Sequence, residues 1–274
     1  MSKMPLITIS GGVGTGAGRV AQLVAKKSRI ELFDDLRLQK EANNMGVRAE
    51  DLKGLNEKAP TFFDSLRYNP ELYLDILESV VYQVSRGGEG VIVGHGSQLL
   101  LRDFGCAMHV FIHASEAYRI EQLMGLYHLT NKAAEKMIRK SDNEKKGFLR
   151  FAFQMDWENP SLYDLVINTE KLGIEGAAKL IMESLLLDGI KECSLKALET
   201  MERMSLLKTV QAALIKAGFS HSQFHVEIPE QGLIQISGYT TTEEDKSRML
   251  KVVKKIPGVT KVKDQVGLMP AGGY

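Results

Sequence analysis

The chain opens with an apolar run, a glycine-rich stretch and a segment with helical periodicity. Residues 5–10 are apolar and rich in β-branched residues, which predicts a buried strand. Residues 18–28 place Val20, Leu23 and Val24 at helical spacing. The glycines at 11–18 lie between these two segments. The pattern therefore predicts a strand, a tight turn and a helix, which is how an α/β unit begins.

Apolar runs continue to alternate with helical patterns through the first 190 residues. Strands are predicted at 90–96, 107–115 and 164–170, with a further strand ending at Asp34, and helices within 36–86, 116–126, 131–140 and 173–187. Strands separated by helices predict an α/β fold, a parallel sheet flanked by helices. Ligands of such sheets bind at the carboxyl ends of the strands, which is where the glycine turn lies.

The pattern changes after about residue 190. An amphipathic helix is predicted at 202–217, two strands at 224–230 and 232–240, a helix at 241–256 and a strand at 259–269. This order, α-β-β-α-β, predicts a small α+β module with its own core. We place the boundary between residues 188 and 201, with modules at 1–190 and 198–274. Because the link shows no strong apolar run, we expect residues 1–192 to fold alone.

Composition limits the kind of partner. The 274 residues are 44% hydrophobic and 25% charged, which is typical of a globular protein. A net charge of +1 gives no strong field for nucleic acid or a membrane surface. Cys106 and Cys193 are far apart in sequence, predict no disulfide framework and fit a reducing compartment. No run reaches the roughly 18 apolar residues of a membrane span. A soluble, cytoplasmic protein is expected.

The glycine turn has the outline of a phosphate-binding loop without its lysine. Gly11 and Gly16 have the spacing of G-x-x-x-x-G-K-[ST], but Ala17 and Gly18 stand where Lys and Ser/Thr are expected. Backbone N–H groups of residues 12–18 can still bind a phosphate, helped by the dipole of the following helix. The alternative is a tight turn that binds nothing. The candidate nucleotide-binding residues are Gly11, Gly12, Gly14, Thr15, Gly16, Ala17 and Gly18.

Several motifs together point to a family. They are "ITIS…GTG", "LFDD", "EKAPTFFDSL", "PELYLDIL", "VIVGHG", "IRKSDNEKKGFLRF" and "DWENPSLYDLVINT". Residues 5–185 thereby resemble the cytidylate kinase-like family of P-loop nucleoside monophosphate kinases. The tail, with "GLIQISGYT" and "IPGVTKVKDQV", resembles a BON domain, a small binding module of bacterial proteins. The resemblance implies ATP with Mg²⁺, a nucleoside monophosphate acceptor such as CMP, and a lipid, another small ligand or a protein at the tail.

The resemblance makes "RKSDNEKKGFLR" a basic lid that neutralises the transferring phosphoryl group. Its candidate catalytic cations are Arg139, Lys146 and Arg150, with Lys145 and Arg119 as further candidates. The first three are seven and four residues apart, so on one helix they would share a face. The alternative is a solvated charged helix. Arg19 is a further candidate, but one residue turns a helix by about 100°, which could point it away from the phosphates.

The acceptor site is expected at the ends of two strands. Its candidates are Asp34, Asp35, Arg37 and His95, with Arg67 as a weaker one. The aspartates could order a metal-bound water, bind a base or ribose, or cap the following helix. The family usually has Arg where His95 stands. His95 is therefore either a weaker phosphate ligand than Arg or a polar residue whose hydrogen bonds are satisfied within the protein. His221 and His225 are too few for a metal site, and none is predicted.

Two functions of different class remain open at this point. One is an ATP-dependent nucleoside monophosphate kinase in which Arg19 and the lid cations replace the missing lysine. The other is a catalytically inactive, nucleotide-sensing or scaffold protein fused to a binding module, with homo-oligomerisation possible in either case. The missing loop lysine and the His in place of Arg at position 95 each remove an electrostatic contact worth about 3 kcal/mol in the transition state. Two such losses without substitutes would abolish turnover.

Overall fold

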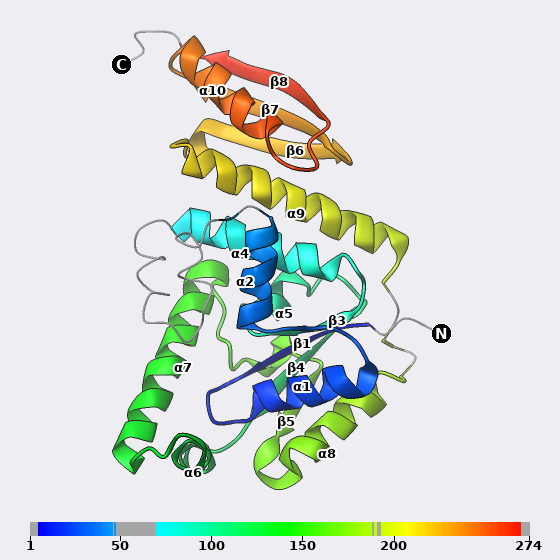
Figure 1. Ribbon diagram of the computed structural model, residues 1–274, viewed down its shortest axis with the longest axis vertical. Coiled ribbons are helices and arrows are strands. Elements are labelled where there is room, and N and C mark those ends of the chain that lie inside the picture. Colours follow the sequence, from blue (N-terminus) through cyan, green and yellow to red (C-terminus); the bar gives the residue numbers. More distant parts are fainter. Residues whose placement is uncertain (1–4, 46, 48–69, 188, 191–192, 270–274) are drawn as a thin grey trace.

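The computed structural model describes residues 5–45, 47, 70–187, 189–190 and 193–269. Arg67 and the segment "EKAPTFFDSL" lie outside the described residues. Figure 1 shows a larger part built on a parallel sheet, a small sheet at the other end of the molecule, and a long helix between them. The described elements follow the predicted alternation of strands and helices.

The larger sheet has five strands in the order β2-β3-β1-β4-β5. They are β1 (Leu6–Gly11), β2 (Leu32–Phe33), β3 (Gly90–Val93), β4 (Ala107–His113) and β5 (Leu165–Asn168). Every neighbouring pair is parallel. The predicted parallel sheet is therefore confirmed, and β1, which leads into the glycine turn, is its central strand.

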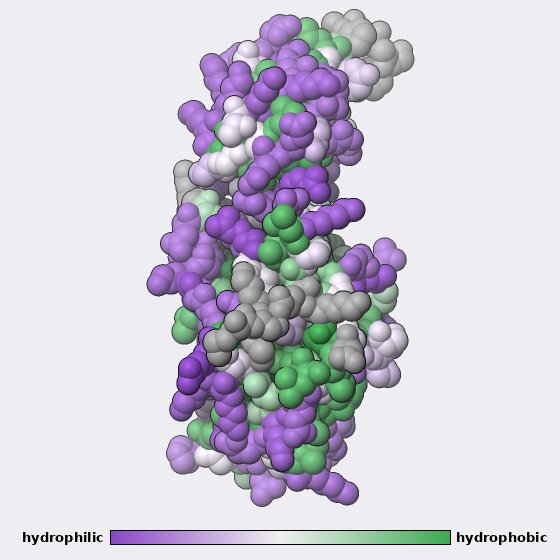
Figure 2. Space-filling model, turned by 90° about the vertical axis from the view of Figure 1, so that its right-hand side faces the viewer, coloured by the Kyte–Doolittle hydropathy of each residue, from purple (hydrophilic) through white to green (hydrophobic). Residues whose placement is uncertain are grey.

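Helices cover both faces of this sheet (Figure 1). One face packs on α1 (Ala17–Ser28) and α8 (Thr169–Ser184). The other packs on α2 (Asp35–Asn44), α4 (Pro70–Ser85) and α5 (Ser97–Leu100). Among the described residues, no helix combines the length and apolar character needed to cross a bilayer. On the face seen in Figure 2, hydrophilic residues predominate in the upper part, and hydrophobic residues gather below the middle of the molecule.

Two helices stand beside the carboxyl edge of the sheet. They are α6 (Glu116–Tyr127) and α7 (Asn131–Phe153). The pattern predicted that the second helix would end near residue 140, and this boundary is wrong. The helix continues because Phe148 and Leu149 in its last turns are buried in the core, and it ends where Gln154 adopts a left-handed conformation, φ 54°. The lid-like sequence is therefore part of one continuous helix.

The C-terminal module has the predicted order α-β-β-α-β. Its elements are α9 (Leu195–Lys216), β6 (Phe224–Glu230), β7 (Leu233–Thr240), α10 (Glu243–Lys254) and β8 (Lys261–Leu268). Strand β7 is central, antiparallel to β6 and parallel to β8. The side chain of Thr242 accepts a hydrogen bond from Asp245 N and caps α10. Ile234, Ile236 and Met249 are fully buried in the module's own core.

Helix α9 packs against both parts of the molecule (Figure 1). Its Met201 is buried in the core of the larger part, whereas Val210 and Leu214 are buried in the core of the small one. Ser205 Oγ donates to Ser79 O on α4 at 2.9 Å. The helix begins at Leu195 rather than near residue 202, because Ser194 caps it. We expected the link between the two modules to make no firm contact with either of them. Helix α9 begins within that link and packs against both parts.

A charge cluster around the buried carboxylate of Asp75 joins α4 to α9 and to the turn that follows α9. Lys208 Nζ lies 3.2 Å from Asp75 Oδ1 and 2.7 Å from Glu78 Oε2, and His221 Nε2 lies 3.1 Å from Asp75 Oδ2. Burial raises the pKa of the Asp75 carboxyl against the opposing effect of Lys208 and His221. Burial alone would lower the pKa of Lys208, but Glu78 and Asp75 outweigh it and raise that pKa. The cluster holds the interface together through charge as well as packing.

The two cysteines form a disulfide, which corrects the expectation from their count and spacing. Cys106 precedes β4 and Cys193 precedes α9, and their Cα atoms lie 4.8 Å apart. The sequence separation of 87 residues hid this pair because α9 folds back onto the end of the sheet. The cysteines therefore give no argument for a reducing compartment.

One core histidine makes stability depend on pH. His109 on β4 is buried, and its Nδ1 lies 2.8 Å from Thr8 Oγ1. Burial lowers the pKa of His109 below its ordinary value, against the attraction of Asp164. A lowered folded-state pKa gives stability that is present above about pH 6.5 and is lost as the pH falls. Urea unfolding is expected to give a smaller free energy of unfolding near pH 5 than near pH 7.

The matched variants for this prediction are His109→Gln and His113→Gln. His113 is exposed at the end of the same strand. The dependence between about pH 7 and pH 5 should weaken in the first variant and persist in the second. An unchanged pH profile in His109→Gln would contradict the assignment.

Candidate functional site

The glycine turn forms a tight loop at the carboxyl end of β1. Gly14 and Gly16 have φ values of 85° and 83°, which side-chain-bearing residues rarely adopt. Thr15 Oγ1 donates to Gly12 O at 2.7 Å inside the loop. Thr169 Oγ1, at the start of α8, donates to Thr15 O at 2.7 Å and fixes the loop from outside. The loop is therefore held in one shape at the N-terminus of α1.

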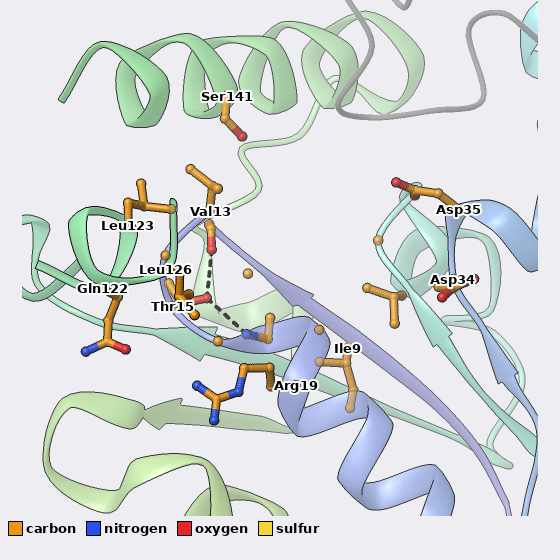
Figure 3. Close-up of a pocket in the computed structure, with 18 of the residues that line it drawn as sticks. Ile9, Val13, Thr15, Arg19, Asp34, Asp35, Gln122, Leu123, Leu126 and Ser141 are labelled. Atoms are coloured by element: carbon orange, nitrogen blue, oxygen red, sulfur yellow. Dashed lines mark hydrogen bonds between the residues drawn. The ribbon is translucent and has the colours of Figure 1, made fainter. Parts of the chain in front are cut away.

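A cavity of about 700 Å³ opens at this loop. Figure 3 shows Thr15 and Val13 on one side, Asp34 and Asp35 across from them, and Ser141 of α7 above. The cavity includes all seven candidate nucleotide-binding residues, Gly11, Gly12, Gly14, Thr15, Gly16, Ala17 and Gly18. Tyr118, Gln122 and Tyr127 extend it along α6. The volume and the mixed apolar and polar lining suit a nucleotide-sized ligand.

Two glycines of the loop make a matched test of this geometry. A Cβ at Gly14 would lie 2.8 Å from Arg119 O, whereas a Cβ at Gly18 would meet nothing within 4 Å. We expect Gly14→Ala to lower the free energy of unfolding by about 1–3 kcal/mol and to weaken nucleotide binding. Gly18→Ala should stabilise α1 by about 0.5–1 kcal/mol without that loss. Thermal melting and ATP titration of both variants check this, and equal effects would contradict it.

Arg119 on α6 supports the loop rather than facing the cavity. Its Nε donates to Val13 O at 2.7 Å, and its two terminal nitrogens bind the Asp142 carboxylate at 2.8 and 2.7 Å. The side chain is only 9% exposed. A Cβ at Gly12 would lie 2.6 Å from this guanidinium, so the glycine permits the close approach. Arg119 thereby ties α6, the loop and α7 together.

Lys145 on α7 brings a positive charge to the loop. Its Nζ donates to Gly11 O at 2.5 Å. The ammonium also lies 5.7 Å from the ring centroid of Trp157, a cation–π contact. Trp157 is buried edge-on against Phe111. Burial raises the pKa of Tyr163 to about 12, so its hydroxyl stays protonated and donates to Trp157 O at 2.6 Å. The "DWENPSLYDLVINT" segment thus positions Lys145.

The three cations proposed for the lid share one face of α7, but not the face at the cavity. The cavity is lined instead by Met137, Lys140, Ser141, Glu144 and Lys145. At about 100° per residue, that face is roughly opposite to the one carrying Arg139, Lys146 and Arg150. Arg139 pairs with Glu135 on the helix surface. Lys140, which does line the cavity, lies 3.8 Å from Glu144 and is partly neutralised by it.

The proposed acceptor residues separate into two groups. Asp34 and Asp35 both line the cavity. Asp34 caps α2 by accepting from Arg37 N at 3.0 Å, and Asp35 Oδ1 lies 2.9 Å from His95 Nε2. His95 is only 1% exposed and does not line the cavity, so its effect on a ligand would come through its contact with Asp35. The carboxylates can serve a ligand, whereas His95 orients one of them.

Two arginines differ in their relation to the cavity. Arg37 forms ion pairs with Glu31 and Glu41 and lines a separate hollow beside β2. The hydrogen bond that Arg37 Nε donates to Glu31 Oε1 is the main reason that the pKa of Arg37 is raised. Arg19 is exposed at the cavity rim, and in Figure 3 it extends from α1 away from Asp34 and Asp35.

Sequence reasoning missed three residues that shape the site. They are Asp142, Trp157 and Thr169, which hold Arg119, Lys145 and the loop respectively. Asp142 was hidden within a charge-rich run. Thr169 follows the last strand of the sheet directly, a position at the same edge as the loop, and that was the available signal.

Comparison with known proteins relates this site to others. The sequence model of the cytidylate kinase-like family matches residues 6–171, more than half of the chain. The chain belongs to this family. Its similar relatives include the cytidylate kinase of Staphylothermus marinus, 26% identical over 183 residues, covering 66% of this chain and 96% of that protein. The cytidylate kinase of Archaeoglobus fulgidus is 27% identical over 186 residues, with coverages of 68% and 97%.

The cytidylate kinase-like part also resembles a solved structure. The crystal structure of an uncharacterized protein from Eubacterium ventriosum gives a TM-score of 0.53 at 22% identity, covering 67% of this chain and 98% of that one. This likeness concerns the fold alone. With its order β2-β3-β1-β4-β5 and its loop after β1, the cytidylate kinase-like part has a P-loop kinase fold. The family match ends at residue 171, before the C-terminal module begins.

Proposed function

We propose that this protein is an ATP-dependent nucleoside monophosphate kinase whose missing loop lysine is replaced by Lys145. The observation that carries the proposal is the ammonium of Lys145 on Gly11 O, at the mouth of the glycine loop. The backbone amides of the loop and this ammonium face one cavity. The ammonium is a compact positive charge of the kind that binds phosphate groups in proteins. Family membership supports CMP as the first acceptor to test.

In this reaction an oxygen of the acceptor phosphate attacks the γ-phosphorus of ATP, and the bond to the bridging oxygen of the departing ADP breaks. Little covalent chemistry falls to the protein, which positions the groups and stabilises charge. The loop amides would hold the donor phosphates, and Lys145 would neutralise charge developing on them. Lys145 comes from α7 rather than from the loop, so its contribution depends on how α7 lies on the loop.

The carboxylates at the cavity fit the Mg²⁺ that such kinases use. Mg²⁺ prefers one or two carboxylates together with substrate phosphates and water. Asp34 and Asp35 are hard oxygen donors lining the same cavity as the loop, so they would hold the ion. When bound, Mg²⁺ neutralises the phosphate oxygens of ATP. Gly18 offers no hydroxyl to the ion, so the aspartates would supply the protein ligands.

The test is a coupled assay of ADP release with CMP, dCMP, UMP and AMP as acceptors and ATP with Mg²⁺ as donor. We expect acceptor-dependent turnover, highest with CMP or dCMP. Absence of turnover with all four acceptors, while the protein remains folded, would overturn the kinase proposal.

A second candidate is a nucleotide-binding protein without transfer activity. The observation in its favour is that several cations are already engaged elsewhere. Arg119 binds Asp142, Arg37 binds two glutamates, and the face of α7 with Arg139, Lys146 and Arg150 does not line the cavity. Calorimetry with ATP, ADP, CMP and pyrophosphate distinguishes the two candidates. Binding without turnover would favour this second function, and binding of none would reduce the loop to a structural turn.

For the C-terminal module we propose a BON-like role in binding a ligand or partner. Its order α9-β6-β7-α10-β8 and its separate core support this proposal. Flotation with vesicles of anionic phospholipid tests the lipid form of it. Co-flotation of the full chain is expected, with loss at high salt if the contact is electrostatic. No flotation would exclude these vesicles as the ligand surface.

A further inference from the structure

A second cavity, of about 310 Å³, lies between the two parts of the molecule. It is enclosed by the end of α2, the end of α4, the middle of α9 and two turns of the small sheet. We call it the inter-module cleft. Six of its lining residues carry the argument: Asn44, Gln83, Arg86, Arg203, Gly232 and Gly258. No residue of the glycine-loop cavity lines it.

The charge of the cleft is positive. Arg86 follows α4, and Arg203 lies on α9, so the guanidinium groups come from the two sides of the interface. Arg86 lies 3.6 Å from Glu202, a long ion pair between half-exposed side chains. Within the described part of the chain, Arg203 forms no ion pair. The lining therefore carries two guanidinium groups against the single carboxylate of Glu202, and a bound anion would balance the remaining positive charge.

Neutral donors and an apolar wall complete the cleft. Gln83 Oε1 accepts from Ser205 Oγ at 3.4 Å, so its amide NH₂ is not used in that bond. Leu206 and Pro257 supply apolar surface. Gly232 has φ 77°, and a Cβ there would lie 2.7 Å from Thr260 Oγ1, so this turn requires glycine to approach its neighbour. Such a lining suits a small molecule with one strongly anionic end.

We propose that the inter-module cleft binds a small phosphomonoester, no larger than a nucleoside monophosphate. A guanidinium presents paired N–H groups that match phosphate oxygens, and two of them can balance a dianion. The size limit follows from the volume of about 310 Å³. The amides and apolar wall would contact the rest of the ligand. This site is separate from the glycine loop and does not depend on kinase activity.

The test is hydrogen–deuterium exchange on the full chain with CMP, inorganic phosphate and succinate as separate probes. CMP and phosphate should slow exchange in peptides covering the turns at 231–232 and 257–258, and succinate should not. Peptides covering 8–20 report the glycine loop separately, because α2 keeps the two cavities about 15 Å apart. Failure at the cleft is thus distinguishable from failure at the loop.

Variants connect the signal to the two arginines. Arg86→Gln and Arg203→Gln should each raise the CMP concentration needed for half-maximal protection of these turns about tenfold or more. Each substitution removes a charge-assisted contact with the phosphate. Arg203→Lys should retain part of the protection by CMP. Arg102 is exposed and lies outside the cleft, so Arg102→Gln should leave the protection unchanged. Matching melting temperatures would show that the variants fold. No protection by either phosphate probe, equal protection by succinate, or full protection in the double Gln variant would overturn the proposal.

Discussion

Replacing Lys145 by methionine is expected to lower kcat with CMP and ATP by about 100- to 1000-fold. The ammonium on Gly11 O is the cation that α7 brings to the loop, and such a contact is commonly worth about 3 kcal/mol in the transition state. Methionine keeps a long side chain able to pack on Trp157, so the fold should persist. Steady-state kinetics and thermal melting measure the two effects separately, and the KM for ATP should change much less than kcat.

The neighbouring lysine is the matched control. Lys146 does not line the cavity, so Lys146→Met should keep turnover within about threefold of wild type. A rescue experiment sharpens the test. Ala17 occupies the position where a phosphate-binding loop carries lysine, so adding Ala17→Lys to Lys145→Met should restore part of the lost kcat. Equal losses in both lysine variants would remove Lys145 from its proposed role.

Deleting everything after residue 192 is expected to destabilise the cytidylate kinase-like part severely. The deletion removes α9 and with it the packing of Met201 and Ala212 against that part's core. It also removes the partner of Cys106. Burying a large apolar side chain such as Met201 is worth roughly 1.5–3 kcal/mol, so the total loss should exceed about 3 kcal/mol. We therefore replace the expectation that residues 1–192 fold alone by the expectation that this fragment is severely destabilised. Experiment has still to decide between the two.

Urea unfolding and solubility of three proteins would decide this point. They are the full chain, the fragment 1–192 and a fragment 1–218 that keeps α9. In the third, Val210, Leu214 and Ile215 are changed to glutamine, because these side chains belong to the core of the missing module. We expect the longer fragment to unfold at higher urea than the shorter one. If 1–192 unfolds as the full chain does, the α4–α9 contact contributes little to stability.

Much of the fold follows from local pattern. Residues 5–10 and 107–115 are apolar enough to be recognised as buried strands, and the order of elements in both parts was predicted. Helix ends were less predictable, because tertiary burial decides them: Phe148 extends α7 beyond the charged run that looked like a surface lid. The disulfide was invisible for the same reason, since only the return of α9 brings Cys193 to Cys106.

The candidate site was predictable in its glycine loop and its two aspartates, but not in its cation. The glycine spacing located the loop, and "LFDD" located Asp34 and Asp35 at its cavity. Which cation faces the loop depends on the rotation of α7 about its axis, and periodicity among charged residues does not reveal that rotation. The spacing of Arg139, Lys146 and Arg150 correctly placed them on one face, but burial of Ile138 and Phe148 sets which face turns inward.

The central position of β1 has a consequence for how the chain is made. Its Leu6 pairs with Gly90 on one side and Ala107 on the other, so both neighbours emerge from the ribosome about a hundred residues later. During that interval β1, which is buried along its whole length in the folded protein, has no partner and can meet other nascent chains. Such long sequence separations also slow folding, because a large loop must close before any pairing is gained. We expect cells to yield more native protein when a chaperone binds β1 during translation and keeps it covered until β3 and β4 have been made.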